Sequence, residues 1–383
     1  MLSCDSWLDI LDRLGLRFYT GVPDSLLKDP LLAMNERIPA ERHVIAANEG
    51  NAVAIATGHY LATGNPALVY LQNSGLGNAL NPLASLASPA ASGIPMLLMV
   101  GWRGEPNQRD EPQHMLQGSI TPATLDLLGI PWGILSSDEG RVEEQIRGLM
   151  ERSIAEKPQP FALLIRKGTF ASYSNPRAIE NPENHGEEPP EREGVIGILL
   201  EALSEDDVVV ATTGKTGREV FAVRKRCGGW KGQDFLNVGA MGHASSIALG
   251  LAIGLPQRKV ICIDGDGAAL MHLGAMATIG SIQPANFIHI LLNNTCHESV
   301  GGQPTTAPAL NFAELASVCG YRTMRRLTSS EQLGSAISRL TLEAGPAFLE
   351  VMIRTGSRPD LERPDQHPTS GRESFMRHLG SRQ

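Results

Sequence analysis

The stretch from Val260 to Asn294, VICIDGDGAALMHLGAMATIGSIQPANFIHILLNN, decides the fold of this chain. An apolar run rich in β-branched residues ends in the DGDG of residues 264–267, a helical pattern follows, and a second apolar run ends in Asn293-Asn294. This periodicity predicts a strand, a helix and a second strand. Parallel strands joined in this way place both polar ends at the same edge of the sheet.

Asp266 and Asn294 are therefore expected to lie side by side at strand carboxyl ends, where open α/β sheets bind ligands. One carboxylate, one amide oxygen and nearby backbone carbonyls make a set of hard oxygen donors. Such a set suits Mg²⁺ that is shared with phosphate oxygens. The glycines on either side of Asp266 let a diphosphate approach the backbone closely. The alternative is an ordinary strand–helix–strand unit with a glycine turn.

Composition and length restrict the class of protein. A chain of 383 residues has room for about two domains with ample core. The net charge of −8, with no basic run, argues against a nucleic-acid surface. The 5 cysteines are scattered and lack CxxC spacing, which fits a reducing cytoplasm and no zinc site. We expect no signal peptide, and no apolar run is long enough to span a bilayer.

The chain reads as two similar α/β halves. We predict a first domain over 1–170, a proline-rich charged linker over 171–193, a second domain over 194–355, and a polar tail over 356–383. Each domain is expected to hold a mostly parallel sheet flanked by helices. A Gly-Lys-Thr triplet at 214–216 suggests a P-loop, but that motif needs glycine where Val209 stands.

Polar loops follow several predicted strands of the first half. Asp24 and Ser25 follow one strand, and the residues alone favour a helix N-cap there. Glu49 opens a helix, where it would complement the helix dipole or act in catalysis. A glycine-rich loop over 72–78 and a long polar loop over 101–114 follow two further strands. Long polar loops after strand ends commonly carry function.

The spacing in the second half resembles a known signature. GDG, then 25 residues (268–292), then Asn-Asn resembles the pattern of thiamine-diphosphate enzymes. GVPDSLLKD, ANEGNAVAIATG, TTGKTGRE and HESVGGQPT further resemble the family of phosphonopyruvate and sulfopyruvate decarboxylases, the former more closely. The resemblance implies a pyrimidine-binding domain followed by a diphosphate-binding domain, with no middle domain. It also implies thiamine diphosphate, Mg²⁺, a small 2-oxo acid substrate, and no membrane or nucleic-acid partner.

The resemblance assigns roles to individual residues. Glu49 would hydrogen-bond the aminopyrimidine ring, and Met241 would force the cofactor into its bent shape. Asp266 and Asn294 match metal ligands, with the Cys296 carbonyl as a third. The other residues that it places at the cofactor are Asn73, Thr213, Gly214 and Gly267.

Substrate contacts follow less directly. A phosphonate needs hydrogen-bond donors, and arginine gives the best forked match. His114 and His297 are candidate catalytic residues that could carry protons. The other candidates are Asp24, Ser25, Asn73, Arg103, Arg109, Gln113 and Gln303. The sequence does not decide which cation meets the phosphonate.

The predicted function is thiamine-diphosphate-dependent decarboxylation of 3-phosphonopyruvate to phosphonoacetaldehyde and CO₂ in phosphonate biosynthesis. Alternatives are a sulfopyruvate decarboxylase, a carboligating synthase, and a non-catalytic cofactor-binding or regulatory protein. The resemblance also implies a homodimer or higher homo-oligomer, with the active site between subunits. Glu49 of one subunit would then face Asp266 of the next.

Overall fold

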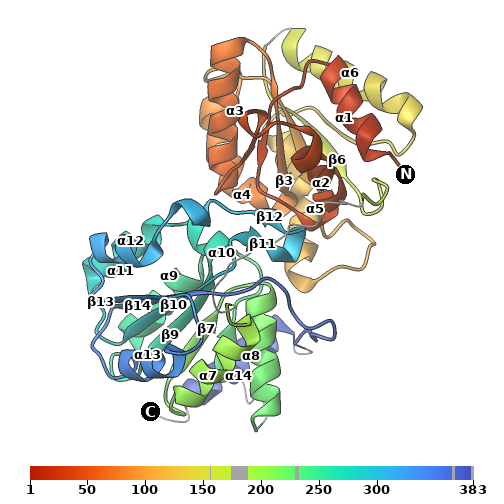
Figure 1. Ribbon diagram of the computed structural model, residues 1–383. Helices are drawn as coiled ribbons and strands as arrows, with labels where there is room; N and C mark the ends of the chain where they lie inside the picture. Colours follow the sequence, from red (N-terminus) through yellow and green to blue (C-terminus); the bar gives the residue numbers. More distant parts are fainter. Residues whose placement is uncertain (156, 174–188, 229–232, 365–366, 381–383) are drawn as a thin grey trace. The chain divides into compact units, whose positions relative to one another are not determined.

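The computed structural model describes the chain except residues 156, 174–188, 229–232, 365–366 and 381–383. The chain divides into two compact units, Met1–Glu180 with Ser299–Pro304 and Asn181–Glu298 with Thr305–Gln383. Each unit is built on a six-stranded sheet (Figure 1). The predicted domain boundaries stay predictions, and most of the predicted linker falls outside the described residues.

The first unit holds an all-parallel sheet in the order β2-β1-β3-β4-β6-β5. Its strands are β1 (Tyr19–Gly21), β2 (His43–Ile45), β3 (Ala67–Gln72), β4 (Met96–Gly101), β5 (Trp132–Ile134) and β6 (Phe161–Ile165). Its helices are α1 (Cys4–Arg13), α2 (Lys28–Arg37), α3 (Glu49–Thr63), α4 (Leu76–Pro82), α5 (Pro112–Leu127) and α6 (Glu139–Ala155). The first unit also contains a short strand, β12 (Gln303–Pro304), which lies outside the six-stranded sheet.

Both faces of this sheet are buried, so its central strands are continuously apolar. Leu68 and Tyr70 of β3 join a core with α1, α2 and α6, whereas Val69 and Leu71 join a core with α3, α4 and α5. The alternation follows the two-residue period of a strand. Strand order reverses between β1 and β3, and ligands bind at such a reversal in α/β sheets.

The second unit repeats the design in the order β13-β14-β10-β9-β7-β8, again all parallel. The strands of this sheet are β7 (Val208–Ala211), β8 (Asp234–Leu236), β9 (Val260–Gly265), β10 (Phe287–Asn293), β13 (Thr323–Leu327) and β14 (Ala347–Met352), and the short strand β11 (Cys296–His297) lies outside it. Its helices are α7 (Arg192–Ala202), α8 (Lys215–Arg226), α9 (Ala244–Gly254), α10 (Asp266–Met271), α11 (Gly274–Ile282), α12 (Phe312–Val318), α13 (Leu333–Leu340) and α14 (Pro368–Gly380).

Helices cover both faces of the second sheet. Side chains of α7, α8 and α13 form one core with the sheet, and α9, α11 and α12 lie along the other face (Figure 1). The predicted strand–helix–strand unit is confirmed as β9, α10 with α11, and β10. Strands β9 and β10 pair directly, with Gly265 level with Leu292. The predicted fold class, two α/β units each with a parallel sheet, is confirmed.

The structure departs from the sequence prediction in two places. The long polar loop predicted over 101–114 ends earlier than expected, because α5 begins at Pro112, where proline suits the first turn. Gln113 and His114 therefore lie on the first turn of α5 rather than in a loop. The predicted polar tail contains α14, whose Phe375 packs near Phe235 with ring centroids 5.7 Å apart. Among the described residues, no helix is long and apolar enough to cross a membrane.

Candidate active site

Asp266 and Asn294 meet at the carboxyl ends of β9 and β10. The Asp266 carboxylate accepts hydrogen bonds from the backbone N–H groups of Gly267 and Asn294. The Thr305 hydroxyl donates to Asp266 Oδ2 over 2.6 Å. The two predicted metal ligands are therefore in direct contact, as the parallel pairing of their strands requires.

Among the residues that the structure describes, no cationic side chain contacts Asp266 to balance its negative charge. Its side chain is buried, and burial raises its pKa to about 6 against the opposing hydrogen bonds. A buried carboxylate surrounded by neutral donors is stabilised by a bound cation. Asn294, whose backbone N–H reaches this carboxylate, carries an amide oxygen, so the two side chains offer donors of the hard oxygen type. These residues fit Mg²⁺.

Gly267 marks where Met241 and His297 come together. A Cβ on Gly267 would lie 3.1 Å from His297 Nδ1 and 3.5 Å from Met241 Cε. The missing side chain therefore keeps a narrow space open beside the two predicted cofactor residues. His297 is buried, which lowers its pKa to about 4. The imidazole is therefore neutral at physiological pH, which argues against the predicted role of His297 as a group that is charged near neutral pH.

The loop after β7 borders the same sheet edge. Thr213 Oγ1 accepts a hydrogen bond from the Gly239 N–H over 3.1 Å, which ties this loop to the segment leading to Met241. Gly214 precedes α8 with φ of +96°, a conformation that side chains disfavour. Backbone at a helix start of this kind can approach a diphosphate closely.

Thr295 stands between two predicted metal ligands in a strained conformation. Its φ of 60° is rare for a β-branched residue. The strained turn brings the Cys296 N–H to within 3.3 Å of Asn294 Oδ1. Strain of this kind persists where surrounding structure enforces it, often at functional sites.

In the first unit, Glu49 is held at the start of α3. Asn78 Nδ2 donates to Glu49 Oε2 over 2.7 Å, and Asn48 caps the helix by accepting from the Gly50 N–H over 2.8 Å. Burial raises the pKa of Glu49, and the hydrogen bond from Asn78 opposes the rise. Gly75 packs so closely that a Cβ there would lie 2.3 Å from Glu49 Oε1. The Glu49 carboxyl group is thus buried, held in one orientation, and has a raised pKa that favours its protonated form.

Several predicted substrate residues form one hydrogen-bonded group after β1, β3 and β4. Arg103 forms an ion pair with Asp110, with Nε 2.8 Å from Oδ2, and its Nη1 donates to Ser25 Oγ over 2.9 Å. Asn73 Nδ2 donates to the Arg103 carbonyl over 2.8 Å and to Thr121 Oγ1 over 3.0 Å. Asn73 therefore braces the Arg103 turn, and its contact with cofactor or substrate stays a prediction.

Four other candidates hold buried polar atoms without a hydrogen-bond partner among the described residues, namely Asp24 Oδ1, Gln113 Oε1, His114 Nδ1 and both amide atoms of Gln303. Such atoms in native proteins require an explanation, and an absent ligand is one. Asp24 Oδ2 does cap a short helical turn by accepting from the Leu26 N–H, as the residues alone suggested. Burial raises the pKa of Asp24 to about 6. Arg109, by contrast, is exposed.

Sequence reasoning missed the residues that support these groups. Asn78 and Gly75 fix Glu49, Thr305 binds Asp266, and Glu298 accepts from Asn294 Nδ2 over 3.0 Å. The available signal was position, since Asn78 belongs to the polar loop over 72–78 and Glu298 lies four residues after Asn294. Nothing in their residue types alone distinguishes them from ordinary polar residues.

A buried Cys262, Asp264 and His289 group lies in β9 and β10. Their potential ligand atoms lie within 4.8 Å of one another. Burial raises the pKa of the Cys262 thiol well above its usual value, so the thiolate that a metal needs is disfavoured. His289 instead forms a hydrogen bond with Tyr321, with Nδ1 3.3 Å from the hydroxyl, and its Nε2 lies 3.6 Å from Asp264 Oδ2. The group is better explained as a polar network within the sheet.

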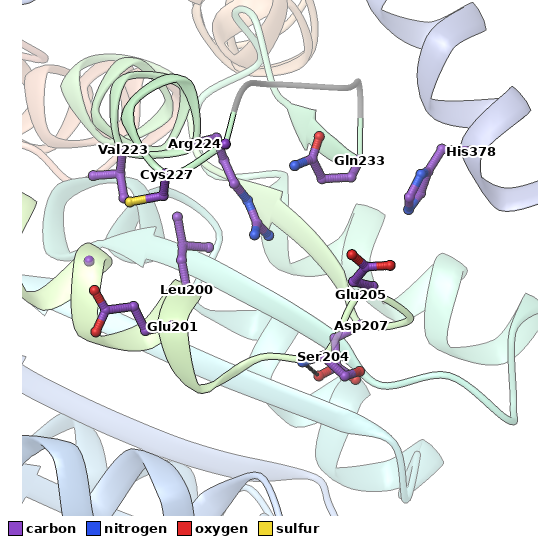
Figure 2. A pocket seen from close by; sticks show the side chains of 12 residues that line it. Leu200, Glu201, Ser204, Glu205, Asp207, Val223, Arg224, Cys227, Gln233 and His378 are labelled. Carbon is purple, nitrogen blue, oxygen red and sulfur yellow. Dashed lines mark hydrogen bonds between the residues drawn. The ribbon is translucent and has the colours of Figure 1, made fainter.

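A cavity of about 310 Å³ lies elsewhere in the second unit (Figure 2). Its lining includes Glu201, Arg224 and His378, and none of the predicted site residues belongs to it. Arg224 is already paired with Asp234 at 3.0 Å. The cavity is therefore distinct from the strand edge that carries Asp266.

Comparison with known proteins agrees with this geometry. Residues 4–125 match the N-terminal TPP binding domain of thiamine pyrophosphate enzymes, and residues 225–351 match their C-terminal TPP binding domain. The chain belongs to the thiamine pyrophosphate enzyme family. Thiamine diphosphate, the same compound, is accordingly its cofactor.

Curated relatives extend along nearly the whole chain. Phosphonopyruvate decarboxylase of Streptomyces viridochromogenes is 36% identical over 375 residues, covering 95% of this chain and 92% of that protein. The Streptomyces hygroscopicus enzyme of the same name is 35% identical, covering 96% and 92%. Sulfopyruvate decarboxylase of Methanosarcina acetivorans is 29% identical, covering 91% of each chain.

Proposed function

We propose that this chain catalyses the Mg²⁺- and thiamine-diphosphate-dependent decarboxylation of 3-phosphonopyruvate to phosphonoacetaldehyde and CO₂. It would act in the cytoplasm, in phosphonate biosynthesis. The observation that carries the proposal is the 36% identity to a phosphonopyruvate decarboxylase across 95% of the chain. In this protein, Glu49, Asp266 and Asn294 follow the carboxyl ends of strands β2, β9 and β10, where a cofactor of this kind would be bound.

Thiamine diphosphate, when bound, supplies the electron sink for the electrons released as the substrate carboxylate leaves. The protein's part is to bind, orient and transfer protons. Asp266, Asn294 and the Cys296 carbonyl would hold Mg²⁺, and the Thr213–Gly214 backbone would face the diphosphate. Glu49, with its raised pKa, would share a proton with the aminopyrimidine ring.

Arg103 and Ser25 are our candidates for the phosphonate. Three N–H groups of Arg103 engage Asp110 and Ser25, and a guanidinium has five, so two remain for a ligand. Replacing Arg103 with Lys removes the forked geometry and should raise KM for phosphonopyruvate by about tenfold, the loss expected for about 1.4 kcal/mol. Arg109→Lys, at an exposed arginine, is the matched control. A KM that rises equally in both variants would contradict this assignment.

A side-by-side assay tests the substrate. The purified protein is given phosphonopyruvate or sulfopyruvate, each with and without Mg²⁺ and thiamine diphosphate. We expect faster turnover of phosphonopyruvate, and only with both cofactors present. The 29% identity to a sulfopyruvate decarboxylase supports the second candidate function, since both substrates end in a tetrahedral anion. Higher kcat/KM for sulfopyruvate would establish that alternative.

A carboligating synthase is a further alternative. Product analysis with an added aldehyde acceptor separates it from a simple decarboxylase. We also propose a homodimer or larger homo-oligomer in which Glu49 of one subunit and Asp266 of another serve the same cofactor. The support for this arrangement is the family resemblance.

A further inference from the structure

The side-chain amide of Asn294 has two chemically different ends, and its orientation decides whether it can bind a cation. The oxygen can ligate Mg²⁺, whereas the NH₂ group is a donor and cannot. Asn294 Nδ2 donates to Glu298 Oε2 over 3.0 Å. Asn294 Oδ1 accepts from the Cys296 N–H over 3.3 Å, which leaves a second lone pair on that oxygen.

Glu298 is itself fixed by four donors. Its Oε1 accepts from Lys215 Nζ over 2.7 Å and from the Gly356 N–H over 3.0 Å. Its Oε2 accepts from Arg192 Nη1 over 2.9 Å as well as from Asn294. Arg192 is buried and also forms a forked ion pair with Glu219. A carboxylate held in this way cannot rotate to release the Asn294 amide without breaking several charge-assisted bonds.

We infer that Glu298 is a positioning residue for the metal site: it turns the oxygen of Asn294, rather than the nitrogen, toward the cation. This inference rests on the proposed role of Asn294 as a Mg²⁺ ligand. The backbone N–H of Asn294 also donates to the Asp266 carboxylate, so the main chain holds the two predicted ligands together while Glu298 orients the side-chain amide. Loss of Glu298 should therefore weaken Mg²⁺ binding rather than the chemical step.

A purely structural role for Glu298 is the competing explanation. In that case the carboxylate only balances Lys215 and Arg192, and its removal would loosen the whole edge of the unit. The two roles separate when Asn294 is replaced by Asp. A carboxylate presents oxygen at both ends, so an Asp at this position does not need to be oriented.

The test is a double-mutant cycle on the full-length protein with Glu298→Ala, Asn294→Asp and the combined variant. Mg²⁺ is titrated calorimetrically in the presence of saturating thiamine diphosphate, and melting temperatures are recorded without metal. We expect Glu298→Ala to weaken Mg²⁺ binding by about 10- to 100-fold, the usual loss when a ligand's supporting partner is removed. In the Asn294→Asp background the same change should cause no loss, or a gain, because it also removes the repulsion between two carboxylates.

An equal loss in both backgrounds, or no loss in either, would overturn the inference. If Glu298→Ala does not fold, Glu298→Met, which has a similar length but no oxygen to accept from Asn294 Nδ2, is carried through the same cycle with the same expectation. A wild-type protein that shows no Mg²⁺-dependent binding of thiamine diphosphate would instead refute the proposed function, and the inference with it. The wild-type titration therefore separates the two failures.

Discussion

The two units use the same type of sheet but surround their key carboxylates differently. In the described part of the first unit, the side chain that orients Glu49 by a hydrogen bond is the neutral amide of Asn78, and Gly75 packs closely against the carboxyl group. Asp266 in the second unit accepts backbone and hydroxyl donors, and its neighbour Asn294 is tied to the charged group around Glu298. A carboxyl that must exchange a proton gains from few fixed partners, whereas a metal ligand gains from many.

Asp266→Ala, in the second unit, should have the largest effect of the substitutions considered. The variant loses the charged ligand, so affinity for Mg²⁺ with thiamine diphosphate should fall by more than about 100-fold, the upper end for residues that only support a ligand. Isothermal titration measures the loss. Near-normal binding would show that the cation is held elsewhere.

Glu49→Gln tests the first unit. The amide keeps the shape of the side chain but cannot share a proton, so we expect kcat to fall by about 10²–10⁴-fold with thiamine diphosphate affinity changed far less. Steady-state kinetics and exchange of the thiazolium C2 proton followed by NMR provide the measurements. Unchanged decarboxylation would remove Glu49 from the mechanism.

Gly75→Ala tests whether close packing against Glu49 is needed for activity. The new Cβ would meet Glu49 Oε1 at 2.3 Å, so the carboxyl must shift. A shift of ~1 Å can lower the rate by about 10²-fold, so we expect kcat to fall by about 10- to 100-fold with the fold retained. Gly77→Ala is the matched control, since a Cβ there meets nothing within 4 Å. Equal rates for the two variants would count against the close packing as a determinant of activity.

Asp24→Asn tests whether Asp24, like Glu49, is a buried carboxyl group of the first unit whose charged form is disfavoured by burial. Burial raises its pKa from 3.8 to about 6, so the charged form lowers stability, and the penalty grows as pH rises from about 3.8 to 6. Removing the charge should stabilise the protein at pH 8, by about 3 kcal/mol, and have little effect near pH 4. Denaturant unfolding at both pH values tests this, with the exposed Asp12→Asn as control. A pH-independent difference would mean that folding leaves the pKa of Asp24 unshifted.

The sequence predicts the framework well because strand periodicity and glycine-rich strand ends are local signals. Val260–Asn294 alone indicates two adjacent parallel strands, and the structure confirms the pairing that brings Asp266 beside Asn294. The start of α5 was misplaced, because the polar residues around Pro112 gave the pattern of a loop.

The contacts that hold Glu298 and Glu49 in place could not be predicted from the sequence, for a different reason. Lys215, Arg192 and Gly356 converge on Glu298 from three distant parts of the chain, and no periodicity links them. Gly75 shows the same limit, since its packing against Glu49 depends on how α3 and α4 lie together. Residue type and spacing indicate which groups reach a strand end, but tertiary packing decides how they are held.

One measurement tests most directly whether Glu49 and Asp266 serve one cofactor from different subunits. Glu49→Gln and Asp266→Ala chains, each inactive alone, are co-expressed with different tags, and the mixed oligomers are isolated by tandem purification. In a mixed dimer one site carries both substitutions and the other carries none, so decarboxylase activity should return, up to half the wild-type level. Mixed oligomers that remain as inactive as either parent would contradict a site shared between subunits.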